Sequence, residues 1–192
     1  MNNPIKIIET KLLSDNWGIL TKVTYDYRKK NGEKETHIRE IYDRGNGAAI
    51  LLYNKKNRTV ILTRQFRLPT FLNGNSDGRL IEACAGLLDG DSPEDCAKKE
   101  ALEETGYQVT KVRKIFESYM TPGADTEILH FFVGEYNKNM KVSEGGGLDE
   151  EQEHIEVLDL DFDEAFDMIE SGEIRDAKTI MLLQYVKIHR LV

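Results

Sequence analysis

Apolar and polar residues alternate along much of the first 43 residues, a pattern that is typical of half-buried strands. The pattern predicts strands at 5–8, 19–27 and 37–42, and Asn31-Gly32 is a hairpin turn between the last two. Three such strands have one apolar face and nothing to cover it. Residues 1–43 are therefore expected to form a small antiparallel β unit that is not stable alone.

A second pattern begins after Arg44, where Gly45 and Gly47 interrupt the chain. A loop is expected at 68–78, and Asp176 is expected to cap the last helix after the break at Gly172. The predicted strands cover 48–53, 59–66, 80–85, 111–120 and 129–135, and the predicted C-terminal helices cover 162–171 and 177–190. Strands around one central helix, with a helix pair covering them, predict an α/β fold over residues 44–192: an α/β/α sandwich with a mixed sheet.

The central helix has clear start and stop signals. Ser92 suits an N-cap, Pro93 suits the first helical position, and Asp95 sits where a capping-box acid reaches back. Gly106 supplies a residue that can turn left-handed just past Thr105. The helix is expected to run from Pro93 to Thr105.

Three carboxylates lie on one face of this helix. Glu100, Glu103 and Glu104 fall within roughly 100° of arc, and they repel one another. Carboxylates without His or Cys at ligand spacing favour Mg²⁺ or Mn²⁺. The alternative is a solvated acidic face with Lys98 and Lys99 as loose partners, but the preceding strand, Gly turn and cap favour a metal site.

Composition narrows the function further. The 192 residues are 40% hydrophobic and 31% charged, as in an ordinary globular protein, and they carry a net charge of −8. That charge argues against a nucleic-acid partner. Cys84 and Cys96 have no paired spacing, and the chain shows no signal peptide and no apolar run of membrane-spanning length. We expect a cytoplasmic protein with no membrane partner.

Two residues of the predicted strands, one at a strand end and one near the middle of a strand, are candidates for the site. Arg67 ends a strand, and its guanidinium matches phosphate oxygens, although a plain surface arginine is the alternative. Glu82 lies inside a strand, where a carboxylate is costly unless it is paired or coordinates a metal.

Four more residues are candidates for substrate binding, each with a structural alternative. Trp17 could stack on a nucleobase or only pack. Arg39 could face the substrate phosphates or a neighbouring strand. Glu127, in a polar loop, could hold a sugar hydroxyl or be a turn acid, and Asp176 could close over a ligand as well as cap its helix.

A glycine-rich acidic stretch follows at 145–156. Three successive glycines suggest a hinge, and the acids after them repel one another unless a cation is present. Strand-like order resumes at Ile155, which argues against a disordered linker. Glu150, Glu151 and Glu153 remain alternative carboxylates on the evidence of the residues alone.

The central stretch resembles the signature of the Nudix hydrolases. The matching residues are Gly86, Asp91, Lys99, Glu100, Glu103, Glu104, Gly106 and Tyr107. Asp91 replaces the family's Glu, Lys99 replaces its Arg, and the turn between Gly86 and Asp91 is one residue shorter.

The resemblance implies roles for particular residues. It implies a metal site made by Glu100, Glu104, Glu151 and the carbonyl of Ala85, with Gly86 beside the substrate. Counted from the Ile after the glycine-rich loop, Glu151 matches the family's general base. Glu100 and Glu103 are the other catalytic candidates, Glu103 in a supporting role.

Nearly the whole chain resembles the GDP-mannose pyrophosphatase branch of this family. The resemblance implies Mg²⁺-dependent hydrolysis of a nucleotide sugar, with Mn²⁺ as a substitute and GMP and mannose 1-phosphate as products. ADP-ribose, giving AMP and ribose 5-phosphate, is the alternative substrate, and a non-catalytic nucleotide-binding module is the alternative of another class. The resemblance also implies a homodimer built through residues 1–43.

Overall fold

The computed structural model describes residues 3–148, 150 and 152–192. Contacts divide the chain into two compact units. The first contains Met1–Asn46 and Ser118–Leu129, and the second contains Gly47–Glu117 and His130–Val192.

The first unit contains a three-stranded antiparallel sheet, as predicted. Its strands are β1 (Ile5–Asp15), β2 (Ile19–Arg28) and β3 (Lys34–Asp43), paired in the order β1-β2-β3. The prediction ended the first strand at residue 8, whereas β1 continues to Asp15. The pairing of β1 with β2 shifts register between Ile7 and Glu9 and again between Leu12 and Ser14. Each bulge shifts the alternation of side chains between the two faces. The strand therefore continues although its sequence no longer shows a regular alternation of apolar and polar residues.

The second unit is built on a seven-stranded sheet. Its strands are β4 (Gly47–Asn54), β5 (Thr59–Phe66), β6 (Arg79–Glu82), β7 (Cys84–Leu87), β8 (Val112–Tyr119), β9 (Ile128–Glu135) and β10 (Glu156–Asp161). The main order is β10-β5-β4-β9-β8, with β6 paired to β5 and β7 paired to β4. Its helical segments are α1 (Leu68–Leu72), α2 (Pro93–Thr105), η1 (Lys138–Met140), α3 (Phe162–Ser171) and α4 (Ala177–Ile188).

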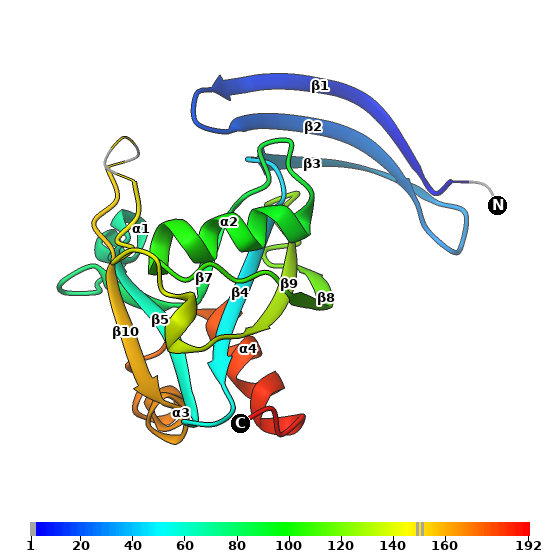
Figure 1. Ribbon diagram of the computed structural model, residues 1–192. Coiled ribbons are helices and arrows are strands. Elements are labelled where there is room, and N and C mark those ends of the chain that lie inside the picture. The colour runs from blue at the N-terminus through cyan, green and yellow to red at the C-terminus, as the bar shows by residue number, and fades with distance from the viewer. Residues whose placement is uncertain (1–2, 149, 151) are drawn as a thin grey trace. The chain divides into compact units, whose positions relative to one another are not determined.

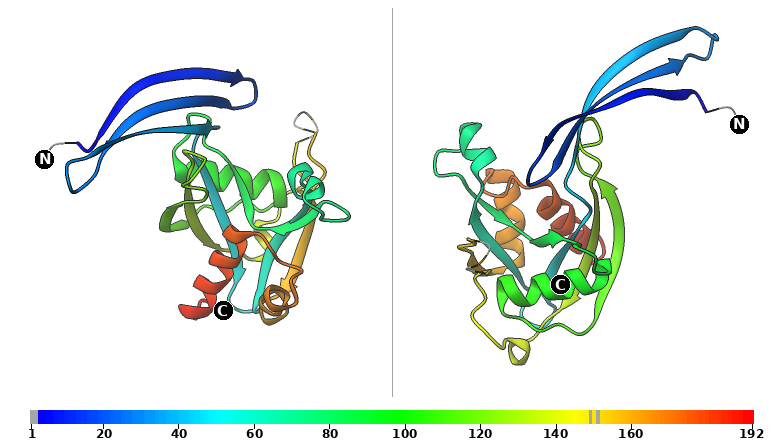
Figure 2. Two further views of the ribbon diagram at one scale, coloured as in Figure 1. Left: turned by 180° about the vertical axis from the view of Figure 1, so that it is seen from behind. Right: turned by 90° about the horizontal axis from the view of Figure 1, so that it is seen from above.

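Helices cover both faces of this sheet, so the predicted α/β fold is confirmed. α2 lies on one face, and α3 and α4 lie on the other (Figures 1 and 2). The alternation of β4 explains the division: Ala48, Ile50 and Leu52 pack in one cluster with Ala97 and Ala101 of α2. No helix among the described residues is long and apolar enough to cross a membrane.

Two local predictions were wrong. The loop expected at 68–78 begins with the short helix α1, which has Pro69 in its first turn, where the ring is tolerated. The single strand expected at 80–85 is two strands, because the chain leaves β5 at Glu82 and joins β4 at Cys84. Between them, the Ala83 N–H donates to Thr179 Oγ1 of α4 at 2.7 Å. A contact 96 residues away in the chain therefore sets this strand break.

Thr179 is fully buried, and its hydroxyl also donates to Asp176 Oδ2 at 2.6 Å. In Thr179→Val, the Ala83 N–H would be left without a buried acceptor and the bond to Asp176 would be lost. We expect this variant to lower the free energy of unfolding by about 2–4 kcal/mol in urea titrations. Thr179→Ser keeps the hydroxyl and loses one methyl, at a cost of about 1 kcal/mol. Equal losses in the two variants would contradict the role assigned to the hydroxyl.

Candidate active site

Helix α2 forms with the limits that the sequence predicted. The Asp95 N–H donates to Ser92 Oγ at 3.2 Å, and Gly106 ends the helix with φ 78°. These caps fix which residues face the sheet, and the buried residues of α2 include Cys96, Ala97, Ala101 and Glu104. The side chain of Glu104 therefore lies on the side of α2 that packs against the sheet.

The carboxylate of Glu100 lies against the end of β7. A Cβ placed on Gly86 would fall 2.2 Å from Glu100 Oε1, so only glycine permits this approach. Ala85, whose carbonyl was predicted as a ligand, directly precedes Gly86 in β7. The structure therefore brings Ala85, Gly86 and Glu100 together. Glu103 lies one turn from Lys99, with 3.8 Å between Oε2 and Nζ.

Glu104 is the most unusual residue of this group. It is 1% exposed, and its Oε2 atom has no hydrogen-bond partner among the described residues. Burial raises the pKa of Glu104 well above its ordinary value, and the nearby carboxylates of Glu100 and Glu153 raise it further. A bound cation would relieve both effects.

The chemistry of these donors fits a hard divalent cation. Glu100, Glu104 and the Ala85 carbonyl offer oxygen atoms only, which Mg²⁺ and Mn²⁺ prefer. Within the described residues, no three His, Cys, Asp or Glu side chains are grouped so as to hold a metal ion. The fourth predicted ligand, Glu151, lies outside the described residues.

A second buried carboxylate, Glu82, is fully paired. It is 2% exposed, and it accepts from Arg67 Nε at 2.8 Å and from Arg67 Nη2 at 3.1 Å. Lys178 Nζ donates to Glu82 Oε2, the oxygen that also accepts from Arg67 Nη2, and it lies 3.0 Å from Asp176 Oδ1. Burial alone would raise the pKa of Glu82, but Lys178 and Arg67 lower it below its ordinary value. The sequence indicated that Glu82 needed a partner, and the structure supplies two.

This network includes two predicted substrate-binding residues. The guanidinium of Arg67 is oriented by a bidentate contact with Glu82. Asp176 caps α4 by accepting from the Thr179 N–H at 3.0 Å. Arg67 and Asp176 are thus linked through Glu82 and Lys178.

The other predicted substrate-binding residues lie in the first unit. Trp17 follows β1 with its side chain 70% exposed, and Arg39 in β3 donates to the Ile38 carbonyl at 2.8 Å. Glu127 is buried and accepts from Arg44 Nη2 at 2.7 Å.

Arg44 is a residue that the sequence reasoning missed. Its guanidinium lies 5.7 Å from the centre of the Trp17 ring, and it also pairs with Glu127. It therefore connects two of the predicted substrate-binding residues. The sequence did not indicate this pair because Glu127 is 83 residues away from Arg44 in the chain. Glu127 needs a cationic partner only because it is buried, and its burial was not predicted.

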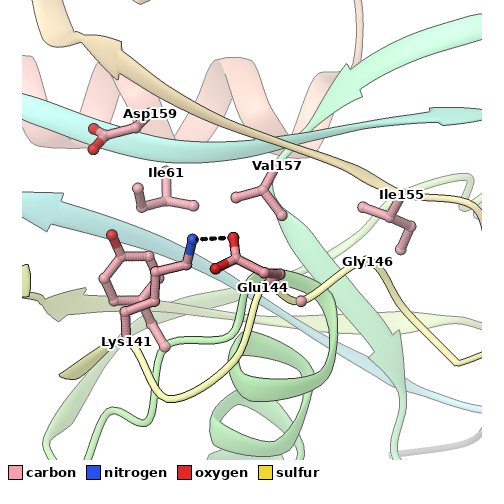
Figure 3. A pocket seen from close by; sticks show the side chains of 9 residues that line it. Ile61, Lys141, Glu144, Gly146, Ile155, Val157 and Asp159 are labelled. Atoms are coloured by element: carbon pink, nitrogen blue, oxygen red, sulfur yellow. Dashed lines mark hydrogen bonds and ion pairs between the residues drawn. The ribbon is translucent and has the colours of Figure 1, made fainter.

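The second unit also contains a cavity of about 400 Å³ (Figure 3). It lies between β5, β10 and the segment at 141–146. The lining residues are Ile61, Tyr107, Lys141, Glu144, Gly145, Gly146, Ile155, Val157 and Asp159. Among the described residues, none of the predicted catalytic, metal-binding or substrate-binding residues lines it.

Comparisons with known proteins match both parts of the chain. The family profile described as "GDP-mannose pyrophosphatase NudK N-terminal domain" matches residues 4–42, and the profile described as "NUDIX domain" matches residues 43–183. Curated GDP-mannose pyrophosphatases of Escherichia coli (strain K12) and Shigella dysenteriae serotype 1 (strain Sd197) are each 56% identical to this chain. Both alignments span 192 residues, which is 100% of each chain.

A solved structure described as "Crystal structure of ADP compounds hydrolase" has the same fold. Its TM-score is 0.74 at 18% sequence identity, and the match covers 99% of this chain and 98% of that chain. Because one profile spans most of the chain and the curated relatives match its full length, the resemblance seen in the sequence is confirmed: this protein belongs to the Nudix family.

Proposed function

We propose that the protein hydrolyses the diphosphate bond of GDP-mannose and releases GMP and mannose 1-phosphate, with Mg²⁺ as cofactor and Mn²⁺ as a substitute. The observation that carries the proposal is the buried Glu104 carboxylate, which lies beside Glu100 and has an unpartnered oxygen. A module that only bound nucleotides would not need a buried acid next to a second carboxylate that repels it. The choice of substrate rests on the full-length relatives, which are named GDP-mannose pyrophosphatases.

Glu100, Glu104, Glu151 and the Ala85 carbonyl would hold the metal. A divalent cation there supplies positive charge to offset the diphosphate oxygens and makes water a better nucleophile. Glu151 would take the proton of the attacking water, and Glu103 would support the neighbouring glutamates.

The remaining residues would bind the substrate. Arg67, which Glu82 orients, would donate its planar fork to the diphosphate. Gly86 would let the substrate approach the main chain, and Asp176 would close over the ligand from α4. Trp17, Arg39 and Glu127 would contact the nucleobase, phosphate and sugar parts.

We also propose that the active form is a cytoplasmic homodimer built through residues 1–43. Large apolar side chains of this unit are exposed in the single chain; they include Ile5, Ile7, Ile8, Leu12, Leu13 and Ile38. A sheet with such a surface is stabilised when a second copy covers it. Cys84 and Cys96 are free thiols, which suits a reducing compartment.

The first test removes one charge from the acidic site. Glu100→Gln and Glu104→Gln are each expected to lower kcat on GDP-mannose by more than about 100-fold, because the amide is a poor metal ligand. Glu94→Gln is the matched control, since Glu94 lies on the same helix and pairs at the surface with Lys98. Circular dichroism would verify folding. A folded Glu104→Gln enzyme with wild-type turnover would overturn the metal assignment.

The second test identifies the base. Glu151→Gln should lose kcat while the substrate Kd changes little, because the residue would act on the attacking water and not only on the metal. Glu150→Gln and Glu153→Gln should have milder effects. Turnover in H₂¹⁸O with GDP-mannose and with ADP-ribose would locate the attacked phosphorus and rank the substrates. If Glu153→Gln or Glu127→Gln abolished turnover instead, the base would be that residue.

The third test concerns assembly. Light scattering at micromolar concentration should give twice the 22.0 kDa mass of one chain. Ile38→Asp should weaken the dimer by placing a charge on the apolar surface, whereas Lys34→Asp, on an exposed polar position of the same strand, should not. A wild-type protein that is monomeric and fully active would refute the proposed dimer.

A further inference from the structure

The three glycines at 145–147 contact the C-terminal end of α2 through their main chain. The Gly146 N–H donates to the Glu104 carbonyl at 2.9 Å, and the Gly147 N–H donates to the Glu103 carbonyl at 3.2 Å. These carbonyls are among the last four of the helix, which have no partner within it. Glu103 and Glu104, whose side chains belong to the acidic site, are therefore also held in place through their backbone carbonyls.

Gly145 allows this contact because it has no side chain. Its φ is +70°, and a Cβ at this position would lie 2.5 Å from the Glu104 carbonyl oxygen and 2.5 Å from the Thr105 carbonyl carbon. Both atoms belong to the backbone of α2, so neither can rotate away. Any other residue would push the segment and the last turn of the helix apart.

The chain that returns to β10 is tied to the same place. The Ile155 N–H donates to the Gly146 carbonyl at 3.1 Å. The Glu153 N–H donates to the Leu148 carbonyl at 3.2 Å, and the Leu148 N–H donates to Glu153 Oε2 at 3.2 Å. Hydrogen bonds therefore fix the chain at Gly146–Leu148 and again at Glu153–Ile155.

We propose that Gly145 is a positioning residue for the metal site, and that Gly145–Gly147 form a main-chain latch on α2. The latch sets the last turn of α2, and with it the buried carboxylate of Glu104, relative to the chain that returns to β10 through Ile155. The sequence suggested a hinge at these glycines, whereas the contacts give them the role of an anchor. This inference rests on the proposed function, because it assigns the latch to the site of that reaction.

A matched pair of glycine variants tests the latch. Gly145→Ala and Gly172→Ala both place a side chain at positive φ, +70° and +80°, but the Cβ at Gly172 would meet nothing within 4 Å. Gly172 caps α3 away from the acidic site, so its variant reports backbone strain alone. Mn²⁺ affinity, measured by titration calorimetry without substrate, should fall about 10- to 100-fold in Gly145→Ala, as for residues that orient metal ligands. It should stay at the wild-type value in Gly172→Ala, and kcat should follow the same order.

Hydrogen exchange of the wild-type protein provides a measurement that needs no variant. The Gly146 and Gly147 amides should exchange far more slowly than free amides, even if Gly145→Ala does not fold. Exchange of both amides at the free rate would overturn the latch, as would a folded Gly145→Ala protein with wild-type Mn²⁺ affinity and kcat. A wild-type protein that bound Mn²⁺ and showed protected amides, but hydrolysed no nucleotide sugar, would refute the proposed function and leave the latch standing.

Discussion

The burial of Glu104 is the constraint on which the rest of the site depends. A carboxyl group that is 1% exposed, with Glu100 and Glu153 nearby, carries its negative charge only if a cation compensates for lost water and repulsion; without one, its raised pKa favours the protonated form. The fold holds it there from several directions: Ser92 and Gly106 cap the helix, Gly86 admits Glu100, and main-chain bonds hold the last turn. The cation proposed above would offset both the burial and the repulsion of this carboxylate.

Glu104 and Glu82 are both buried acids, but they differ in whether a cationic side chain compensates their charge. Glu82 and Glu104 are equally inaccessible, yet their pKa values shift in opposite directions. Glu82 faces Arg67 and Lys178, so its negative charge is compensated within the chain. Glu104 has no such pair among the described residues. The compensated acid orients an arginine, and the uncompensated acid fits a cation that comes from solvent.

The sequence predicted those features of the structure that depend on residues close together in the chain. The limits of α2 followed from Ser92, Pro93 and Gly106, because capping involves residues within one turn of each other. Helical spacing predicted that Glu100 and Glu104 lie close together on α2, but it wrongly separated the acidic face from the packing face, because Glu104 is buried together with Ala97 and Ala101. The break at Ala83 and the partner of Glu127 were not predicted, because Thr179 and Arg44 reach them across long stretches of chain. The full length of β1 was missed because bulges disturb the alternation by which a strand is recognised.

Glycine is the residue whose role changed most between sequence and structure. In the sequence, three glycines in succession indicate freedom of the backbone. In the structure, Gly145 is required by close contact with Glu104 and Thr105, whereas Gly172 has a similar φ and open space around it. Backbone angle alone therefore does not distinguish a flexible glycine from one that permits contact; the neighbouring atoms do. Because the main chain of Gly146 and Gly147 is hydrogen-bonded to the end of α2 and to Ile155, the contacts of these glycines hold the segment in place and do not act as a hinge.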